Sequence, residues 1–309
     1  MKTEDIKKQL FITNEEPPTT DKPAHQPAEN DDYRKYQEQK QKEREEWENI
    51  ISSKDSEFIK CYRKYRHLLK VNRAFFVDID CWEIVFALFD KLKLNKKYVL
   101  DDYRSKTSTD NILNLYARHK NTARPSERKF IEWEYYNDRI SLFHATEKLD
   151  FDVRLTDDES DNDYPGFDEP KDMPPMTQPH EVITLDFDSL SIWQAYLLRL
   201  TDYFIGQRWH GNYHNMEMIF DPRKDIRIFM MRKEERMKYA QQLEELHLDY
   251  EPHIIIEGNT AKIKHIALIG DTRITKCTCT ITYNPKTRNI EKFEFADSEM
   301  IKIPRVFNY

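Results

Sequence analysis

The chain has 309 residues, 34% of them charged and 39% hydrophobic, and a formal net charge of −7. This acidic balance argues against a nucleic-acid partner, because binding to phosphate backbones needs clustered Lys and Arg. No run of about 18 apolar residues occurs, the start lacks the layout of a signal peptide, and four cysteines are too few for a disulfide scaffold, so we expect a cytoplasmic protein without membrane contact.

The N-terminal part is predicted to be a disordered tail followed by helices. Residues 1–30 hold almost no large apolar side chains after Phe11 and Ile12, so little surface is buried there to offset the entropy of ordering. Helix-forming residues over 31–51, and apolar residues three and four apart over 53–70, predict two helices. Another helix is predicted to begin at Ser108 or Asp110. We assign residues 31–154 to a mainly helical domain.

Residues 155–180 are predicted to form an acidic, proline-rich linker. Like charges repel one another, and proline interrupts both helices and sheets, so this stretch favours neither structure. The acidic spacing that begins at Asp161 approaches that of a calcium loop. Pro165 stands where such a loop needs an oxygen ligand, which favours a solvated tether over a metal site.

Residues 181–309 are predicted to form an α+β domain. Asp188 or Ser189 caps a helix, two short strands follow at 213–220 and 226–231 with 221–225 as their loop, and residues 233–246 form a second helix. Four strands of an antiparallel meander then follow, at 253–257, 261–269, 272–283 and 290–296, separated by turn signals. We expect helices packed on one face of this sheet. The order of elements over about residues 188–296 is similar to the cystatin and nuclear-transport-factor-like cone folds, without a diagnostic motif.

The meander also predicts which side chains share a face. If Gly270 and Asp271 form a two-residue turn, His265 pairs with Lys276 and lies on the face opposite to Cys277 and Cys279. A metal site made of His265 and the two cysteines is disfavoured in that register. We predict that both cysteines are small core residues, with Phe295 opposite Cys279.

The stretch from Gly206 to Asn215, GQRWHGNYHN, is predicted to be a structured helix-to-strand turn, with a ligand pocket as the alternative. His210 and His214 would share a helical face as metal ligands, but Gly211 and Asn212 separate them at a predicted helix-to-strand turn, so we expect no metal there. The hypothesis of a ligand-binding or hydrolytic pocket places it on the concave side of the C-terminal sheet, around four residues, where a histidine acts as acid or base. They are Trp209, His210, His214 and Asp271.

The leading hypothesis for function is a non-enzymatic protein-binding module, such as an inhibitor, an immunity-type protein or an adaptor, that presents acidic surface to a basic protein partner. The sequence contains no GxGxxG, GxxxxGK, GxSxG or HExxH motif, and we expect no cofactor. The alternative is a small-molecule-binding or hydrolytic enzyme that uses the candidate pocket. A third hypothesis, RNA binding, rests on the basic residues Arg63, Lys64, Arg66 and Lys70. The oligomeric state is left open.

Overall fold

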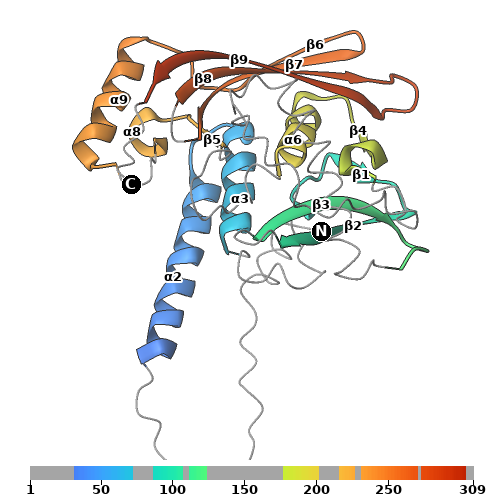
Figure 1. Ribbon diagram of the computed structural model, residues 1–309, viewed down its shortest axis with the longest axis horizontal. Helices are drawn as coiled ribbons and strands as arrows, with labels where there is room; N and C mark the ends of the chain where they lie inside the picture. The colour runs from blue at the N-terminus through green and yellow to red at the C-terminus, as the bar shows by residue number, and fades with distance from the viewer. Residues whose placement is uncertain are drawn as a thin grey trace, which may run out of the picture. The chain divides into compact units, whose positions relative to one another are not determined.

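The protein has an α+β fold, as predicted, with helices in its N-terminal part and antiparallel sheets (Figure 1). The computed structural model describes residues 31–71, 86–106, 111–123, 177–201, 216–226, 231–270 and 273–303. The chain divides into two compact units, Met1–Asp90 and Lys91–Tyr309. The predicted tail, and residues 155–176 of the predicted linker, lie outside the described residues, so both assignments stay predictions.

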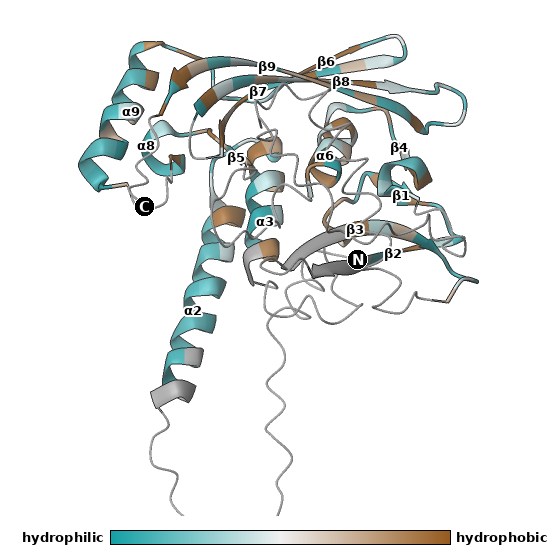
Figure 2. Cartoon of the chain, viewed as in Figure 1, coloured by the Kyte–Doolittle hydropathy of each residue, from teal (hydrophilic) through white to brown (hydrophobic). Residues whose placement is uncertain are grey.

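The first unit contains the two predicted helices, α2 (Asp31–Ser52) and α3 (Glu57–Val71). Figure 2 shows the hydrophilic colour along most of α2, which buries only a few residues near its C-terminal end. Trp47 and Leu68 are fully buried and pack together. The Ser56 hydroxyl accepts the N–H of Ile59 at 3.3 Å, which satisfies a donor in the first turn of α3.

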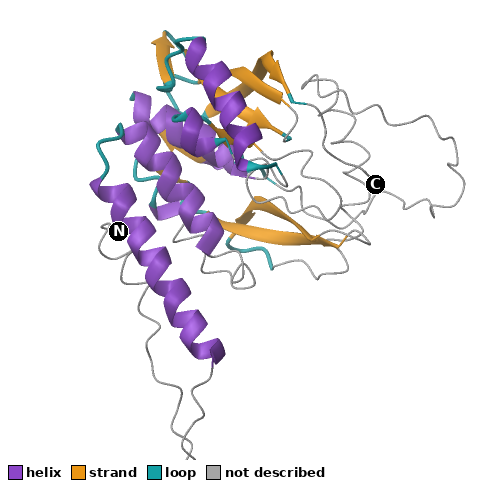
Figure 3. Cartoon of the chain, turned by 90° about the vertical axis from the view of Figure 1, so that its left-hand side faces the viewer, coloured by secondary structure: helices purple, strands orange, loops and turns teal. Residues whose placement is uncertain are grey.

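A hairpin of β2 (Tyr98–Lys106) and β3 (Asn111–His119) replaces the helix that we predicted from Ser108 or Asp110. That prediction was wrong because a short apolar run fits the period of a strand as well as that of a helix, and pairing along the whole of β2 decides between them. Among the described strands, β2 and β3 form a two-stranded sheet of their own that does not pair with the larger sheet; Figure 3 draws the strands in orange. Asp101 is fully buried in it and accepts from Arg118 at 2.7 Å.

Strand pairing joins segments on either side of residues 155–176. Strand β1 (Leu92–Leu94) pairs with β4 (Ile183–Leu185), and an isolated bridge links Ala117 to Thr177. A short 3-10 helix, η2 (Pro179–Val182), leads directly into β4. Part of the segment that we assigned to the helical domain therefore packs within the second compact unit.

The larger sheet is the predicted antiparallel meander. Its strands are β5 (Met216–Met218), β6 (His253–Glu257), β7 (Thr260–Ile269), β8 (Arg273–Tyr283) and β9 (Ile290–Lys302). Strands β7, β8 and β9 lie side by side, while β5 and β6 pair with opposite ends of β7 along its other side. Because β6 and β9 each pair with one strand among the described residues, they form opposite edges of the sheet.

Helix α6 (Ser189–Arg199) packs on one face of this sheet, as predicted. Its side chains Trp193 and Tyr196 contact His265 of β7, and its N-cap is Asp188, whose carboxylate accepts the Ser191 N–H at 2.7 Å. Every residue of α6 from Ser191 to Leu198 is buried. A helix that is apolar on most of its surface has to be covered on all sides, which fits this position.

Helix α9 (Lys233–Glu245) adds cover on the opposite face of the sheet. Its buried residues Ala240 and Leu243 belong to one apolar cluster with Ile266, Leu268 and Ile274, whose side chains alternate with those that face α6. Both faces are therefore covered at this end of β7, and residues 266–269 are all buried.

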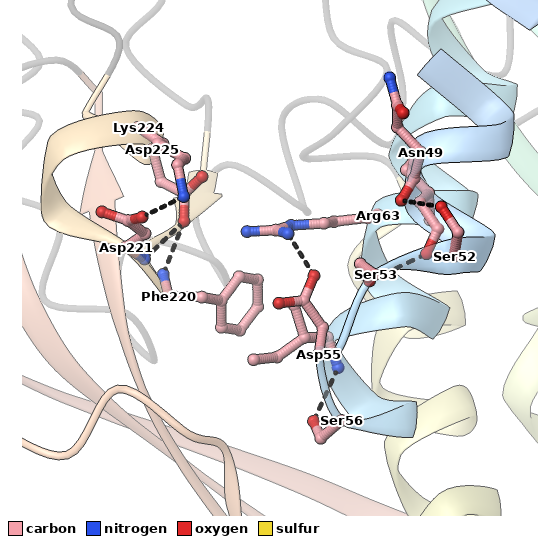
Figure 4. Close-up of polar contacts among 12 residues, drawn as sticks. Asn49, Ser52, Ser53, Asp55, Ser56, Arg63, Phe220, Asp221, Lys224 and Asp225 are labelled. Carbon is pink, nitrogen blue, oxygen red and sulfur yellow. Dashed lines mark hydrogen bonds and ion pairs between the residues drawn. The ribbon is translucent and has the colours of Figure 1, made fainter. Parts of the chain in front are cut away.

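The loop that we predicted at 221–225 is instead a short helix, α8 (Pro222–Asp225). Asp221 caps it by accepting the Arg223 N–H at 3.1 Å, and Pro222 occupies the first helical position, where no N–H is needed. The Asp225 carboxylate accepts the backbone N–H groups of Phe220 and Asp221 (Figure 4). The ends of the strand predicted at 226–231, Ile226 and Met231, lie in no strand.

The predicted register between β7 and β8 was wrong by one residue. Ile269 pairs with Arg273, so three residues rather than two connect the strands, and Gly270 adopts a φ of 57° at the start of that connection. His265 consequently pairs with Cys277 and shares its face. The predicted pairing of Cys279 with Phe295 is confirmed, and both cysteines are buried and free.

Candidate functional site

The four residues of the predicted pocket, Trp209, His210, His214 and Asp271, lie outside the described residues. The rest of the stretch from Gly206 to Asn215 does so as well. The hypothesis of a ligand or hydrolytic pocket at these positions therefore stays a prediction. Four places elsewhere in the described part of the chain gather polar or exposed apolar groups, and each has a different chemistry.

The first place is a closed interior around His265. The Tyr196 hydroxyl lies 2.6 Å from its Nε2 atom, and the Trp193 ring packs edge-on at 6.3 Å. Burial lowers the pKa of His265 to about 4, so the ring is neutral at pH 7 and can accept the tyrosine O–H. Burial likewise raises the pKa of the Cys277 thiol to about 11. This cluster holds the sheet to α6 and offers neither a thiolate nor access for a substrate.

The second place is a small hollow beside η2 and the end of α6. It has about 10 Å³ of space for the centre of a water molecule, roughly what a single water needs. Burial, and then the charge of Arg199, lower the pKa of His180 to about 4. The hollow is too small for a substrate. Its described lining residues are Leu115, Gln178, Pro179, His180, Leu198 and Arg199.

The third place is an open hollow of about 360 Å³ on the first unit, beside α2 and α3. It combines the positive Lys42 and Arg63 with the negative Glu45 and Glu46, so it carries no net preference for an anion or a cation. Arg63, the first residue of the basic set proposed for RNA, forms an ion pair with Asp55 (Figure 4). Its charge is compensated within the protein.

The fourth place, the outer edge of β6, is the strongest candidate. Three consecutive isoleucines, Ile254, Ile255 and Ile256, form the centre of this strand. Ile255 is 45% exposed and Ile256 is 36% exposed. Among the described residues β6 pairs only with β7, so its outer peptide groups have no strand beside them. Such an edge is a template for the strand of another chain.

Both ends of β6 are held in place. At its start, His253 lies 3.0 Å from Asp249, and the Tyr250 hydroxyl donates to the Leu243 carbonyl of α9 at 2.9 Å. At its end, the Tyr283 hydroxyl of β8 donates to the Gly258 carbonyl in the turn at 3.0 Å. The edge is therefore presented by a fixed hairpin, which reduces the entropy that a partner strand has to offset.

The turn determines which peptide groups face outward. Glu257 pairs with Thr260 across two residues, and Gly258 supplies the positive φ of 59° that such a turn needs. The pair that closes a two-residue hairpin is hydrogen-bonded, and hydrogen-bonded pairs alternate along an antiparallel ladder. His253, Ile255 and Glu257 therefore bond inward to β7, while the N–H and C=O groups of Ile254 and Ile256 point away from the sheet.

The sequence predicted strand 253–257 and its turn correctly, but missed that no other described strand lies on its outer side. Side chains of a strand alternate between two faces, so three adjacent isoleucines place at least one apolar group away from the helix-covered face. This run of isoleucines, bounded by His253 and Glu257, is the signal that the sequence contains. Whether the run lies inside the sheet or at its edge depends on which strands pair, and only the structure shows the pairing.

No family model, no curated protein and no solved structure matches the chain. The likeness to the cystatin and nuclear-transport-factor-like folds thus stays one of element order. In the part of the chain that the structure describes, no helix is long and apolar enough to cross a membrane. Within those same residues, no group of three or more His, Cys, Asp or Glu side chains is placed to hold a metal ion.

Proposed function

We propose that this protein is a protein-binding module, and that it takes up an extended segment of its partner along the outer edge of β6. In this mode, called strand addition, main-chain hydrogen bonds supply affinity and alternate side chains supply specificity. The proposal keeps the protein-binding function predicted from the sequence and assigns it to one strand. On the sequence grounds given above, we place the interaction in the cytoplasm.

The observation that carries the proposal is the exposure of Ile255 and Ile256 on an edge strand whose ends are fixed. Burying apolar surface of this kind contributes about 25 cal/mol per Å². An exposed, flat, apolar edge also favours aggregation unless a partner covers it, which is why most edges carry charges, prolines or bulges.

The side chains of β6 also favour a particular kind of partner segment. Its centre is apolar, so the matching segment has an apolar centre. Glu257 is exposed at the end of the run, and a basic side chain opposite it adds a favourable cross-strand pair. The basic group is needed only at this one place along the segment, as the local counterpart of the basic surface expected from the acidic composition of the chain.

Photo-crosslinking in living cells tests the proposal. A photo-reactive p-benzoylphenylalanine replaces Ile255 in one variant of the full chain and Met237 of α9, which is 38% exposed, in a matched control. We expect a covalent adduct with a protein from position 255 and none from position 237. Equal adduct formation at the two positions, or none from 255 in a folded and expressed variant, would overturn the proposal.

A further inference from the structure

We propose that the segment added to β6 is the β6 strand of a second copy of this chain, paired antiparallel about a two-fold axis at Ile255. This inference rests on the proposed function and names the partner at the same edge. Strand β6 has the features expected of the matching segment, since its centre is apolar and the basic group His253 lies at the end opposite to Glu257. Closed two-fold pairing is also the commonest symmetry of protein oligomers.

The outward peptide groups fit this register. A two-fold axis at Ile255 places Ile254 opposite the partner's Ile256, and by symmetry Ile256 opposite the partner's Ile254. These are the residues of β6 whose N–H and C=O groups point away from β7, so each pair exchanges both of its hydrogen bonds. The peptide groups of Ile255, at the axis, stay bonded to β7 in each copy.

Side chains on the face toward α6 match as well. Ile254 pairs with Ile263 and Ile256 with Ala261 within one copy, so this face of the edge continues the apolar interior. In the two-fold register Ile254 lies beside the partner's Ile256 on that face. The apolar row then runs from one copy into the other without a polar interruption, and the 36% exposed surface of Ile256 becomes covered.

The opposite face pairs a basic side chain with an acidic one. His253, Ile255 and Glu257 share this face with Lys264, Lys262 and Thr260 of β7. The register places His253 opposite the partner's Glu257 twice, once on each side of the axis, and Ile255 opposite the partner's Ile255. The charged groups near His253 are Asp249, at 3.0 Å, and Lys264, its neighbour on β7.

The neighbouring two-fold registers are less favourable. An axis at Ile254 brings Pro252 opposite the partner's Ile256, and proline has no N–H to donate to that pair. An axis at Ile256 brings Ile255 opposite the partner's Glu257, which pairs an apolar side chain with a carboxylate. Only the axis at Ile255 avoids both. A single pair of short strands buries less than the roughly 1,600 Å² of a standard interface, so we expect a weak dimer that forms as concentration rises.

Substitutions that change the charges at positions 253 and 257 of the full purified chain test the inference. Sedimentation equilibrium over a range of concentrations measures the dissociation constant of the dimer. His253→Glu alone sets carboxylates opposite each other at two symmetric places, and Glu257→Lys alone removes both favourable pairs. We expect His253→Glu to raise the dissociation constant roughly tenfold and Glu257→Lys to raise it by less. The double variant His253→Glu with Glu257→Lys sets a carboxylate opposite an ammonium at both places, and we expect it to dimerise at least as well as the parent chain.

The results separate this inference from the proposed function. A parent chain that stays monomeric, while p-benzoylphenylalanine at position 255 captures a different protein, overturns the second copy as partner and leaves strand addition standing. A dimer that responds to neither charge variant nor the double exchange overturns the register. A monomeric chain with no adduct from position 255 overturns both proposals.

Discussion

The two edges of the larger sheet are built differently, although they flank the same strands. The β9 edge has register shifts against β8 at two points, between Ile274 and Thr275 and between Thr282 and Tyr283. The β6 edge pairs with β7 without a shift and exposes isoleucine. Six of the 13 residues of β9 are charged: Glu291, Lys292, Glu294, Asp297, Glu299 and Lys302.

Charges and bulges are the ordinary means by which a sheet prevents unwanted pairing at its edge. The β9 edge has both, whereas the centre of β6 has neither. Both strands belong to the same sheet, so the difference between their edges is not explained by one edge being less well folded than the other. Under the proposed function, β6 is the edge that is kept open for pairing, and the following changes test that interpretation.

The largest expected effect on stability comes from His265, which is buried in the sheet to which both edges belong. The pKa of His265 is lowered from 6.5 to about 4, so the folded protein disfavours the protonated ring. Its contribution is fully present above pH 6.5 and is lost as the pH falls from 6.5 towards 4, by up to about 3 kcal/mol. Urea unfolding across this range measures the loss. His180, whose pKa is lowered in the same direction, adds to it.

The control for this prediction is His265→Gln, which removes the titrating ring and keeps a polar group near Tyr196. We expect it to be less stable than the parent at pH 7, because the bond to the Tyr196 hydroxyl is disturbed. Its stability should then fall less between pH 6.5 and 4. Parallel curves for the two proteins would show that His265 is not the group responsible.

Two proline substitutions at adjacent positions test the assignment of inward and outward groups in β6. Ile256→Pro removes an N–H that points away from β7, so we expect stability to change little while dimerisation and the adduct from position 255 are lost. Ile255→Pro removes an inward bond, and we expect a loss of about 1–3 kcal/mol in the free energy of unfolding. Chemical denaturation and sedimentation measure the two effects. Equal destabilisation by both variants would contradict the assignment.

Elements with a strong local signal were predictable from the sequence. The Asp188 cap, the strand 253–257 and the pairing of Cys279 with Phe295 follow from capping preference, turn residues and alternation. The register at His265 was wrong because one added residue in the connection after Ile269 turns every side chain to the other face. The sequence shows Gly270 and Asp271 but does not show whether two or three residues connect the strands.

The candidate site depended on pairing, which local patterns do not contain. Residues 111–119 became a strand because β2 lies beside them, and β6 became an open edge because no described strand lies on its outer side. Both outcomes depend on contacts between segments that are separate in the sequence. The predicted pocket residues Trp209, His210, His214 and Asp271 lie outside the described residues, so the rival hypothesis keeps its sequence basis.

A substitution of Tyr283 is expected to have a smaller effect, confined to the rigidity of the β6 edge. Tyr283→Phe removes the hydroxyl that donates to the Gly258 carbonyl, and we expect a loss of about 1 kcal/mol. Amide hydrogen exchange should become faster at the turn and in β6, and stay unchanged in β9. Tyr250→Phe, which removes the bond to the Leu243 carbonyl, is the matched change near the other end of the strand. Equal acceleration along β9 would indicate global destabilisation instead.

The smallest change in stability is expected when the chemistry of the two edges is exchanged. Ile255→Lys gives β6 a charge like those of β9, and Glu294→Ile gives β9 an exposed isoleucine in place of a carboxylate that pairs with Lys292 at 2.6 Å. Both side chains are exposed, so each free energy of unfolding should stay within about 0.5 kcal/mol of the parent value. Association should move in opposite directions, since Ile255→Lys sets like charges together at the two-fold axis while Glu294→Ile unmasks a second edge. Light scattering at rising protein concentration measures this, and the same response from both variants would mean that the edges do not differ in function.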